Sequence, residues 1–228
     1  MDYNLKTMKL ALLLPGYLDS PDYLHMVIFE KMLHGLDYTV KRLDPCNLWE
    51  TGDTSNYNVT NYLKSIRGTI DSYKSQNIEE LVLIGHSLGG FVAIVAGARF
   101  TEVTKIVALC PPFSVGMSNG NLDESGARHS KRELPFDKSK FREFVVSKSF
   151  IEDRSKYSTI DEVKNLNKPL MILIALDDKQ VSPEDTEQLI KVVKNPYVVR
   201  LENLEHNFRH SEIETNRVAI EIEKFLMQ

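Results

Sequence analysis

Cysteine is scarce in this sequence. Only Cys46 and Cys110 occur among the 228 residues, far apart and with no Cys-x-x-Cys pair. Two thiols cannot form the disulfide framework of a small secreted domain, so that class is excluded and free buried thiols in a reducing compartment are expected. His, Cys and carboxylate residues do not cluster at ligand spacing, so we expect no metal and no organic cofactor.

Long apolar runs are also missing. The longest near the start, Leu10–Pro15, is far too short to cross a membrane. Residues 1–7 lack the apolar region and cleavage pattern of a signal peptide. We therefore expect a cytoplasmic protein without a membrane partner; the oligomeric state is not predicted.

Neither sign of charge dominates. The 28 Lys and Arg residues oppose 32 Asp and Glu residues, for a net charge of −4. A nucleic-acid partner would need a clustered basic face, and we expect none. The short basic cluster Arg128–Arg132 is interpreted as part of a solvated loop. With 42% hydrophobic and 26% charged residues, the composition is typical of a globular protein, and we predict one domain over residues 1–228.

Short apolar runs alternate with longer amphipathic stretches along the chain. The predicted strands are 8–14, 38–43, 81–84, 105–110, 170–175 and 197–201. The predicted helices are 21–33, 60–74, 91–100, 183–193 and 211–225. This alternation predicts an α/β fold, with a mostly parallel sheet of about six strands and helices on both faces.

One region interrupts the alternation. Residues 111–168 separate two predicted strands by more than a simple crossover needs. The region contains polar turns at 117–126 and a helix candidate at 137–153. We interpret it as a small cap inserted over the sheet edge.

The strongest motif is Gly85-His86-Ser87-Leu88-Gly89. It follows a predicted buried strand and opens a helix, which is the context of a nucleophile elbow. The turn is sharp, and glycines on both sides of Ser87 remove the Cβ atoms that would clash there. The alternative is an ordinary glycine-rich turn. A phosphate-binding loop is disfavoured because no Gly-Lys-Ser/Thr follows.

A serine nucleophile needs a base, and the base needs an orienting acid. His206 lies in the loop after the last predicted strand and is our candidate base, with His210 as the alternative. Asp177 and Asp178 follow the fifth predicted strand, where the acid should lie. The order Ser, Asp, His is that of the α/β-hydrolase fold.

On these residues the sequence, from about Lys9 to Phe225, resembles the α/β-hydrolase superfamily, as a small serine carboxylesterase-like member. The resemblance implies Asp178 as the acid, since Ala175–Pro183 is similar to the family pattern Gly-x-x-Asp-x-x-Val-x-Pro. It also implies an oxyanion hole from the backbone N–H groups of Tyr17 and Leu88. The chain departs from the family at three positions: Ala175 replaces a glycine, Pro15 replaces the usual histidine, and Glu205 replaces the usual glycine before the base. Only seven residues precede Met8, so we expect a reduced sheet without the family's opening antiparallel strands.

The expected reaction is acyl transfer to water through an acyl-enzyme on Ser87. A short-chain ester is the first choice of substrate, with a thioester, a small amide or a peptide as alternatives. A non-catalytic, small-molecule-binding member of the fold is the rival class. An apolar pocket is expected, lined by Leu18, Phe113, Val181 and Phe208. Leu134-Pro135-Phe136 and the overall layout resemble small bacterial carboxylesterases, including cinnamoyl and feruloyl esterases.

Overall fold

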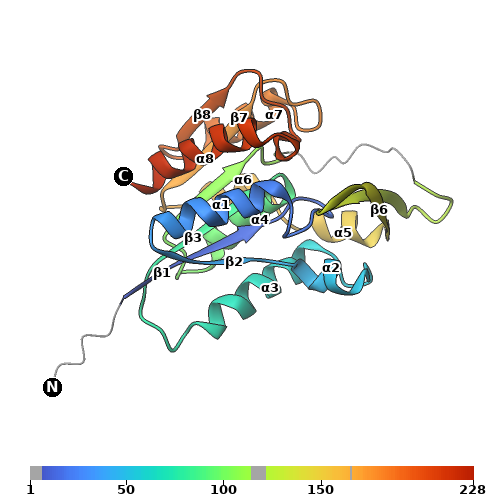
Figure 1. Ribbon diagram of the computed structural model, residues 1–228, viewed down its shortest axis with the longest axis horizontal. Helices are drawn as coiled ribbons and strands as arrows, with labels where there is room; N and C mark the ends of the chain where they lie inside the picture. The colour runs from blue at the N-terminus through green and yellow to red at the C-terminus, as the bar shows by residue number, and fades with distance from the viewer. Residues whose placement is uncertain (1–6, 114–121, 165) are drawn as a thin grey trace.

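The computed structural model describes residues 7–113, 122–164 and 166–228. Its main sheet has six strands in the order β2-β1-β3-β4-β7-β8, and every neighbouring pair is parallel (Figure 1). The predicted fold class is confirmed. The strands are β1 (Met8–Leu14), β2 (Tyr38–Arg42), β3 (Ile78–His86), β4 (Lys105–Leu109), β7 (Leu170–Ala175) and β8 (Tyr197–Leu201).

Helices cover both faces of this sheet. On one face pack α1 (Leu24–Gly35) and α8 (Glu212–Leu226), and on the other α3 (Val59–Ser72), α4 (Leu88–Arg99), α6 (Thr159–Lys164) and α7 (Pro183–Val192). Successive strand residues point to opposite faces, so Leu10, Leu12 and Leu14 of β1 join one core and Ala11 and Leu13 the other. Because both faces are buried, the central strands read as continuous apolar runs.

Local signals define several helix starts. The side chains of Asn58, Ser182 and Ser211 each accept a hydrogen bond from a backbone N–H in the first turn of α3, α7 and α8. Such N-caps satisfy donors that have no partner within the helix. The remaining short elements are η1 (Pro45–Asn47), α2 (Leu48–Thr51) and η2 (Phe208–His210).

The segment inserted between β4 and β7 differs from the prediction. Residues 137–153 do not form one helix: β6 (Asp137–Val146) pairs antiparallel with β5 (Arg128–Leu134), and only α5 (Ser149–Arg154) is helical. The basic cluster Arg128–Arg132 is therefore a strand and not a solvated loop. The predicted turns at 117–121 lie outside the described residues, whereas Asp123–Gly126 forms a turn closed by a 2.9 Å backbone hydrogen bond.

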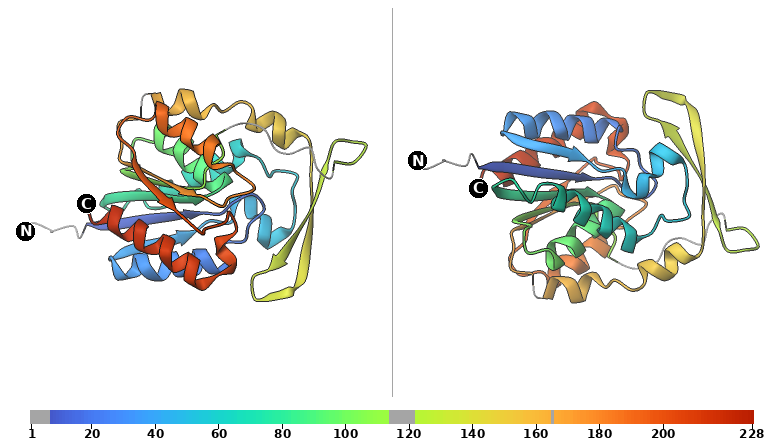
Figure 2. Two further views of the ribbon diagram at one scale, coloured as in Figure 1. Left: turned by 90° about the horizontal axis from the view of Figure 1, so that it is seen from above. Right: turned by 90° about the horizontal axis from the view of Figure 1, so that it is seen from below.

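The hairpin of β5 and β6 lies beyond the carboxyl ends of the parallel strands, at the end of the molecule opposite the two termini (Figure 2). It is anchored to the body by Arg132, Arg142 and Thr54. Arg142 donates a hydrogen bond to the Trp49 carbonyl, and the Thr54 hydroxyl donates one to the Val145 carbonyl. The insertion thus covers the sheet edge where a parallel α/β fold places its ligands. Among the helices of the described ranges, none combines the length and apolar character needed to cross a membrane.

Candidate active site

Ser87 occupies a strained turn between β3 and α4. Its φ of 53° is in the left-handed region, which non-glycine residues rarely adopt, and its N–H donates to the Leu109 carbonyl at 2.8 Å. A Cβ at Gly85 would lie 2.1 Å from the Gly89 carbonyl oxygen, and one at Gly89 would lie 2.0 Å from that of Leu14. Both positions therefore require glycine, as the motif predicts.

The structure brings the predicted base and acid to this serine. His206 Nε2 lies 2.9 Å from Ser87 Oγ, and His206 Nδ1 lies 2.6 Å from Asp178 Oδ2. The other carboxylate oxygen, Oδ1, accepts the N–H groups of Gln180 and Val181, each at 2.8 Å. The carboxylate is thus held in place by its own loop. Because the carboxylate can only accept a hydrogen bond, Nδ1 of His206 carries the proton. Nε2 then has a lone pair that can accept the proton of the serine hydroxyl.

The two alternatives lie elsewhere. Asp177 is exposed, and its backbone N–H donates to the Leu204 carbonyl at 3.1 Å. His210 is exposed and lies 3.4 Å from the Glu133 carboxylate. Glu205, which precedes the base, is exposed as well. Geometry therefore places Asp178 and His206, and neither Asp177 nor His210, at Ser87.

Tyr17 and Leu88 border the same cavity as Ser87. Leu88 is the first residue of α4, where N–H groups have no partner within the helix, and the positive end of the helix dipole adds to their attraction for an anion. Tyr17 lies in the loop after β1, next to Gly16. Both residues therefore border the cavity beside Ser87, and an oxyanion hole formed by their N–H groups stays a prediction.

Four side chains hold the loop that carries Tyr17. The Tyr57 hydroxyl accepts from the Leu18 N–H at 2.9 Å, and Arg132 Nη2 donates to the Tyr17 carbonyl at 2.9 Å. Trp49 Nε1 donates to the Leu18 carbonyl at 3.2 Å, and the Tyr62 hydroxyl donates to the Pro15 carbonyl at 3.0 Å. Arg132 belongs to the inserted hairpin, so this segment also positions part of the site.

A buried polar cluster lies beneath the base. His86 Nε2 lies 3.0 Å from the His206 carbonyl oxygen, which can only accept. Burial lowers the pKa of His86, so we assign a neutral ring with its proton on Nε2. Burial opposes ionisation of Asp19, but the guanidinium groups of Arg209 and Arg132 outweigh it and hold the pKa of Asp19 well below its usual range. Asp19 Oδ2 lies 3.3 Å from Arg209 Nη1.

Among the described residues, two buried groups have the residue types of a metal site. Asp19, His25 and His86 form one, and Cys110, Asp178 and His206 form the other. The second contains the acid and base described above. The first includes the carboxylate that pairs with Arg209, and a guanidinium at this position repels a divalent cation. The absence of a metal cofactor stays a prediction.

A cavity of about 520 Å³ opens over Ser87 and His206, within the usual range of small-molecule sites. Of the predicted apolar lining, only Val181 borders it. Leu18 and Phe208 are fully buried in the core, and Phe113 packs against the core without contributing to the cavity wall. That expectation is corrected: the loops turn these apolar side chains toward the core, and polar residues outnumber apolar ones among the residues that line the cavity.

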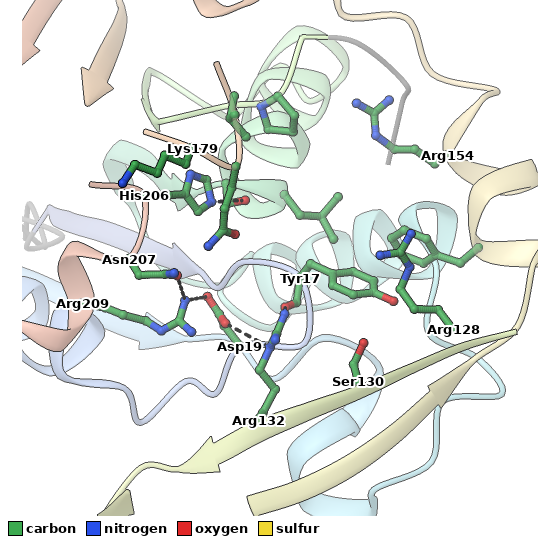
Figure 3. Close-up of a pocket in the computed structure, with 16 residues that line it drawn as sticks. Tyr17, Asp19, Arg128, Ser130, Arg132, Arg154, Lys179, His206, Asn207 and Arg209 are labelled. Carbon is green, nitrogen blue, oxygen red and sulfur yellow. Dashed lines mark hydrogen bonds and ion pairs between the residues drawn. The ribbon is translucent and has the colours of Figure 1, made fainter. Parts of the chain in front are cut away.

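Sequence reasoning missed the cations of this wall. Arg128, Arg132, Arg154, Lys179 and Arg209 all line the cavity (Figure 3). Three of them come from the inserted segment. The available signal is the alternation of residues 128, 130 and 132, since every second residue of a strand points to one face; the prediction of a solvated loop overlooks it.

The parallel sheet, the elbow after its third strand and the Ser, Asp, His order define an α/β hydrolase. The chain belongs to the prolyl oligopeptidase family, whose family model matches residues 49–226. This is a family of hydrolases. No curated protein matches the sequence.

Solved structures share the fold at low sequence identity. Est1E from Butyrivibrio proteoclasticus with bound ferulic acid is 17% identical, with a TM-score of 0.73 over 99% of this chain and 91% of that one. The monoacylglycerol lipase of Paleococcus ferrophilus is 16% identical, with a TM-score of 0.71 over 97% and 96% of the two chains. The esterase domain of a Rhodothermus marinus protein is 18% identical, with a TM-score of 0.69 over 98% and 88%.

Proposed function

We propose that this protein is a serine hydrolase that cleaves small carboxylic esters through an acyl-enzyme on Ser87. The observation that carries the proposal is the continuous chain of hydrogen bonds from Ser87 Oγ to His206 and on to the buried Asp178 carboxylate. A serine hydroxyl is a poor nucleophile without such a base.

In the first half-reaction Ser87 Oγ attacks the ester carbonyl carbon while His206 Nε2 takes the hydroxyl proton. The carbonyl oxygen becomes an oxyanion, which the Tyr17 and Leu88 N–H groups bind. When the tetrahedral intermediate collapses, the carbon–oxygen bond of the ester breaks and His206 returns the proton to the departing alcohol. Water then repeats these steps on the acyl-enzyme, releasing the carboxylic acid and restoring Ser87.

The cavity supports an ester rather than a peptide substrate. A peptidase that recognises a free amino terminus needs an acid to pair with the ammonium group, but Asp19 is the only carboxylate on the described wall and is already paired with arginine. A cavity of about 520 Å³ suits a small ester. Structural neighbours whose names contain esterase or lipase support the same choice.

The test combines a fluorophosphonate probe with p-nitrophenyl esters of increasing chain length. Wild type should be labelled and should hydrolyse the shorter esters, whereas Ser87→Ala should do neither. Ser75→Ala, at an exposed serine outside the site, is the matched control and should behave as wild type. Equal labelling and turnover of wild type and Ser87→Ala refute the proposal, and turnover of peptide-like amides alone supports the peptidase alternative.

A further inference from the structure

One wall of the cavity is built by the inserted segment and is strongly cationic. Arg128, Ser130 and Arg132 lie at alternate positions of β5 and all three line the cavity. Between them, His129 and Lys131 are exposed. In Figure 3, Ser130 and Arg132 extend from the strand toward Tyr17. The strand pairing therefore directs two guanidinium groups inward and the other two basic side chains outward.

A further cation comes from α5. Arg154 is 3% exposed, its guanidinium carbon lies 3.3 Å from the centre of the Phe91 ring, and Nη1 donates to the Tyr157 carbonyl at 3.3 Å. Burial lowers the pKa of Arg154 to about 10, so the side chain still carries its charge at neutral pH. Phe150, one turn earlier on α5, lines the cavity beside it.

Negative charge on the described wall is small. Asp19 is the only carboxylate among the lining residues, and it lies 3.3 Å from Arg209 and 3.7 Å from Arg132. The stretch 114–121, which precedes the hairpin, contains no acidic residue in its sequence. The cavity therefore has a positive potential, and its partly buried cations are screened less by salt than surface charges are.

We propose that the substrate is an ester carrying a second, ionised acid group, which binds to the arginines of the inserted segment while Ser87 attacks the ester carbonyl. This inference rests on the proposed function and adds the substrate class. An arginine guanidinium donates two parallel N–H groups that match the two oxygens of a carboxylate. A neutral ester of the same size would cover these charges without adding a compensating negative charge, at a desolvation cost.

The experiment compares esters that differ in one charge. For the acyl side, monoethyl adipate is compared with ethyl hexanoate; for the alcohol side, γ-acetoxybutyrate is compared with butyl acetate. Acid release is followed at constant pH. We expect kcat/KM for the anionic member of at least one pair to exceed that of its neutral partner about tenfold or more, since hydrogen bonds to charged groups are the stronger ones. The preferred pair shows which side of the ester carries the acid.

Variants connect the preference to the wall. Arg128→Gln should lower kcat/KM for the anionic ester about tenfold, mainly through KM, and change the neutral ester less than about twofold. Arg128→Glu should reverse the preference. Lys131→Gln removes the same charge from the exposed face of β5 and should leave the preference unchanged. Arg154→Met tests the buried cation, and a melting curve checks that this variant folds.

The outcomes separate the two proposals. If Ser87-dependent turnover is equal for both members of each pair, or if Arg128→Gln and Lys131→Gln affect the anionic ester equally, the inference is wrong and the esterase proposal stands. If neither the esters nor the fluorophosphonate probe react at Ser87, the esterase proposal fails, and the inference fails with it.

Discussion

The assignment of the acid is open to a sharp test because two neighbouring aspartates differ only in position. In Asp178 the Oδ2 atom faces His206 Nδ1 at 2.6 Å, and Oδ1 accepts the Gln180 and Val181 N–H groups. An asparagine at 178 must keep its amide oxygen on the two backbone donors, so its NH₂ group faces Nδ1. That arrangement favours the imidazole tautomer with the proton on Nε2, which cannot accept the Ser87 proton.

We therefore expect Asp178→Asn to lower kcat about 10⁴-fold, the loss seen when the wrong tautomer is imposed in other Ser-His-Asp enzymes. This corresponds to about 5.4 kcal/mol of transition-state stabilisation, at about 1.36 kcal/mol per factor of ten. The folded state should persist, because the amide oxygen still satisfies both backbone donors. Asp177→Asn, at the exposed neighbour, should change kcat less than about twofold.

The assay is p-nitrophenyl ester hydrolysis under saturating substrate, with circular dichroism and fluorophosphonate labelling of each variant. Labelling of Asp178→Asn should be slowed in parallel with turnover, since both reactions need an activated serine. The reasoning is refuted if Asp178→Asn retains more than about a tenth of wild-type kcat, or if Asp177→Asn loses as much activity as Asp178→Asn.

Three further predictions concern the frame of the site. Gly89→Ala should destabilise the fold by about 3 kcal/mol or more, because the added Cβ would meet a backbone oxygen at 2.0 Å. Gly68→Ala, in open space on α3, should stabilise the fold by about 0.5–1 kcal/mol. Urea unfolding measures both, and similar values for the two variants would contradict the packing argument. Tyr57→Phe leaves the buried Leu18 N–H without its acceptor, so unfolding free energy should fall by about 1–3 kcal/mol and kcat should fall too; unchanged values in both measurements would show that the hydroxyl is dispensable. The pKa of Asp19 is lowered in the folded state. The ionised carboxylate therefore stabilises the fold fully above the unfolded-state pKa of about 3.9, and this stabilisation is lost as the pH falls below that value. Asp19→Asn should therefore be less stable than wild type at pH 7, by about 3 kcal/mol, and the difference should shrink below about pH 4; a constant difference from pH 7 to pH 3 would contradict the ion pair.

The inserted segment shows where local pattern failed. Residues 137–153 have helix-like spacing, yet Asp137–Val146 is a strand whose Phe144 and Val146 are buried at a spacing of two. A strand of this kind is stabilised by pairing with β5 and by packing on Trp49, and these contacts come from residues distant in sequence. No window of sequence contains them, so propensity alone could not decide between helix and strand.

What the sequence determined by itself was the central sheet and the chemistry at its carboxyl edge. Buried parallel strands must be apolar on both faces, and a nucleophile elbow needs glycine at 85 and 89, so both features are visible in local composition. Strand order predicted the loops that carry the acid and the base, whereas the choice of Asp178 over Asp177 rested on the family resemblance. Only the tertiary structure decided what surrounds Ser87. Leu18 and Phe208 turn into the core, while Arg128 and Arg154 come from an insertion whose fold depends on long-range pairing, so the charge of the cavity could not be derived from neighbours in the chain.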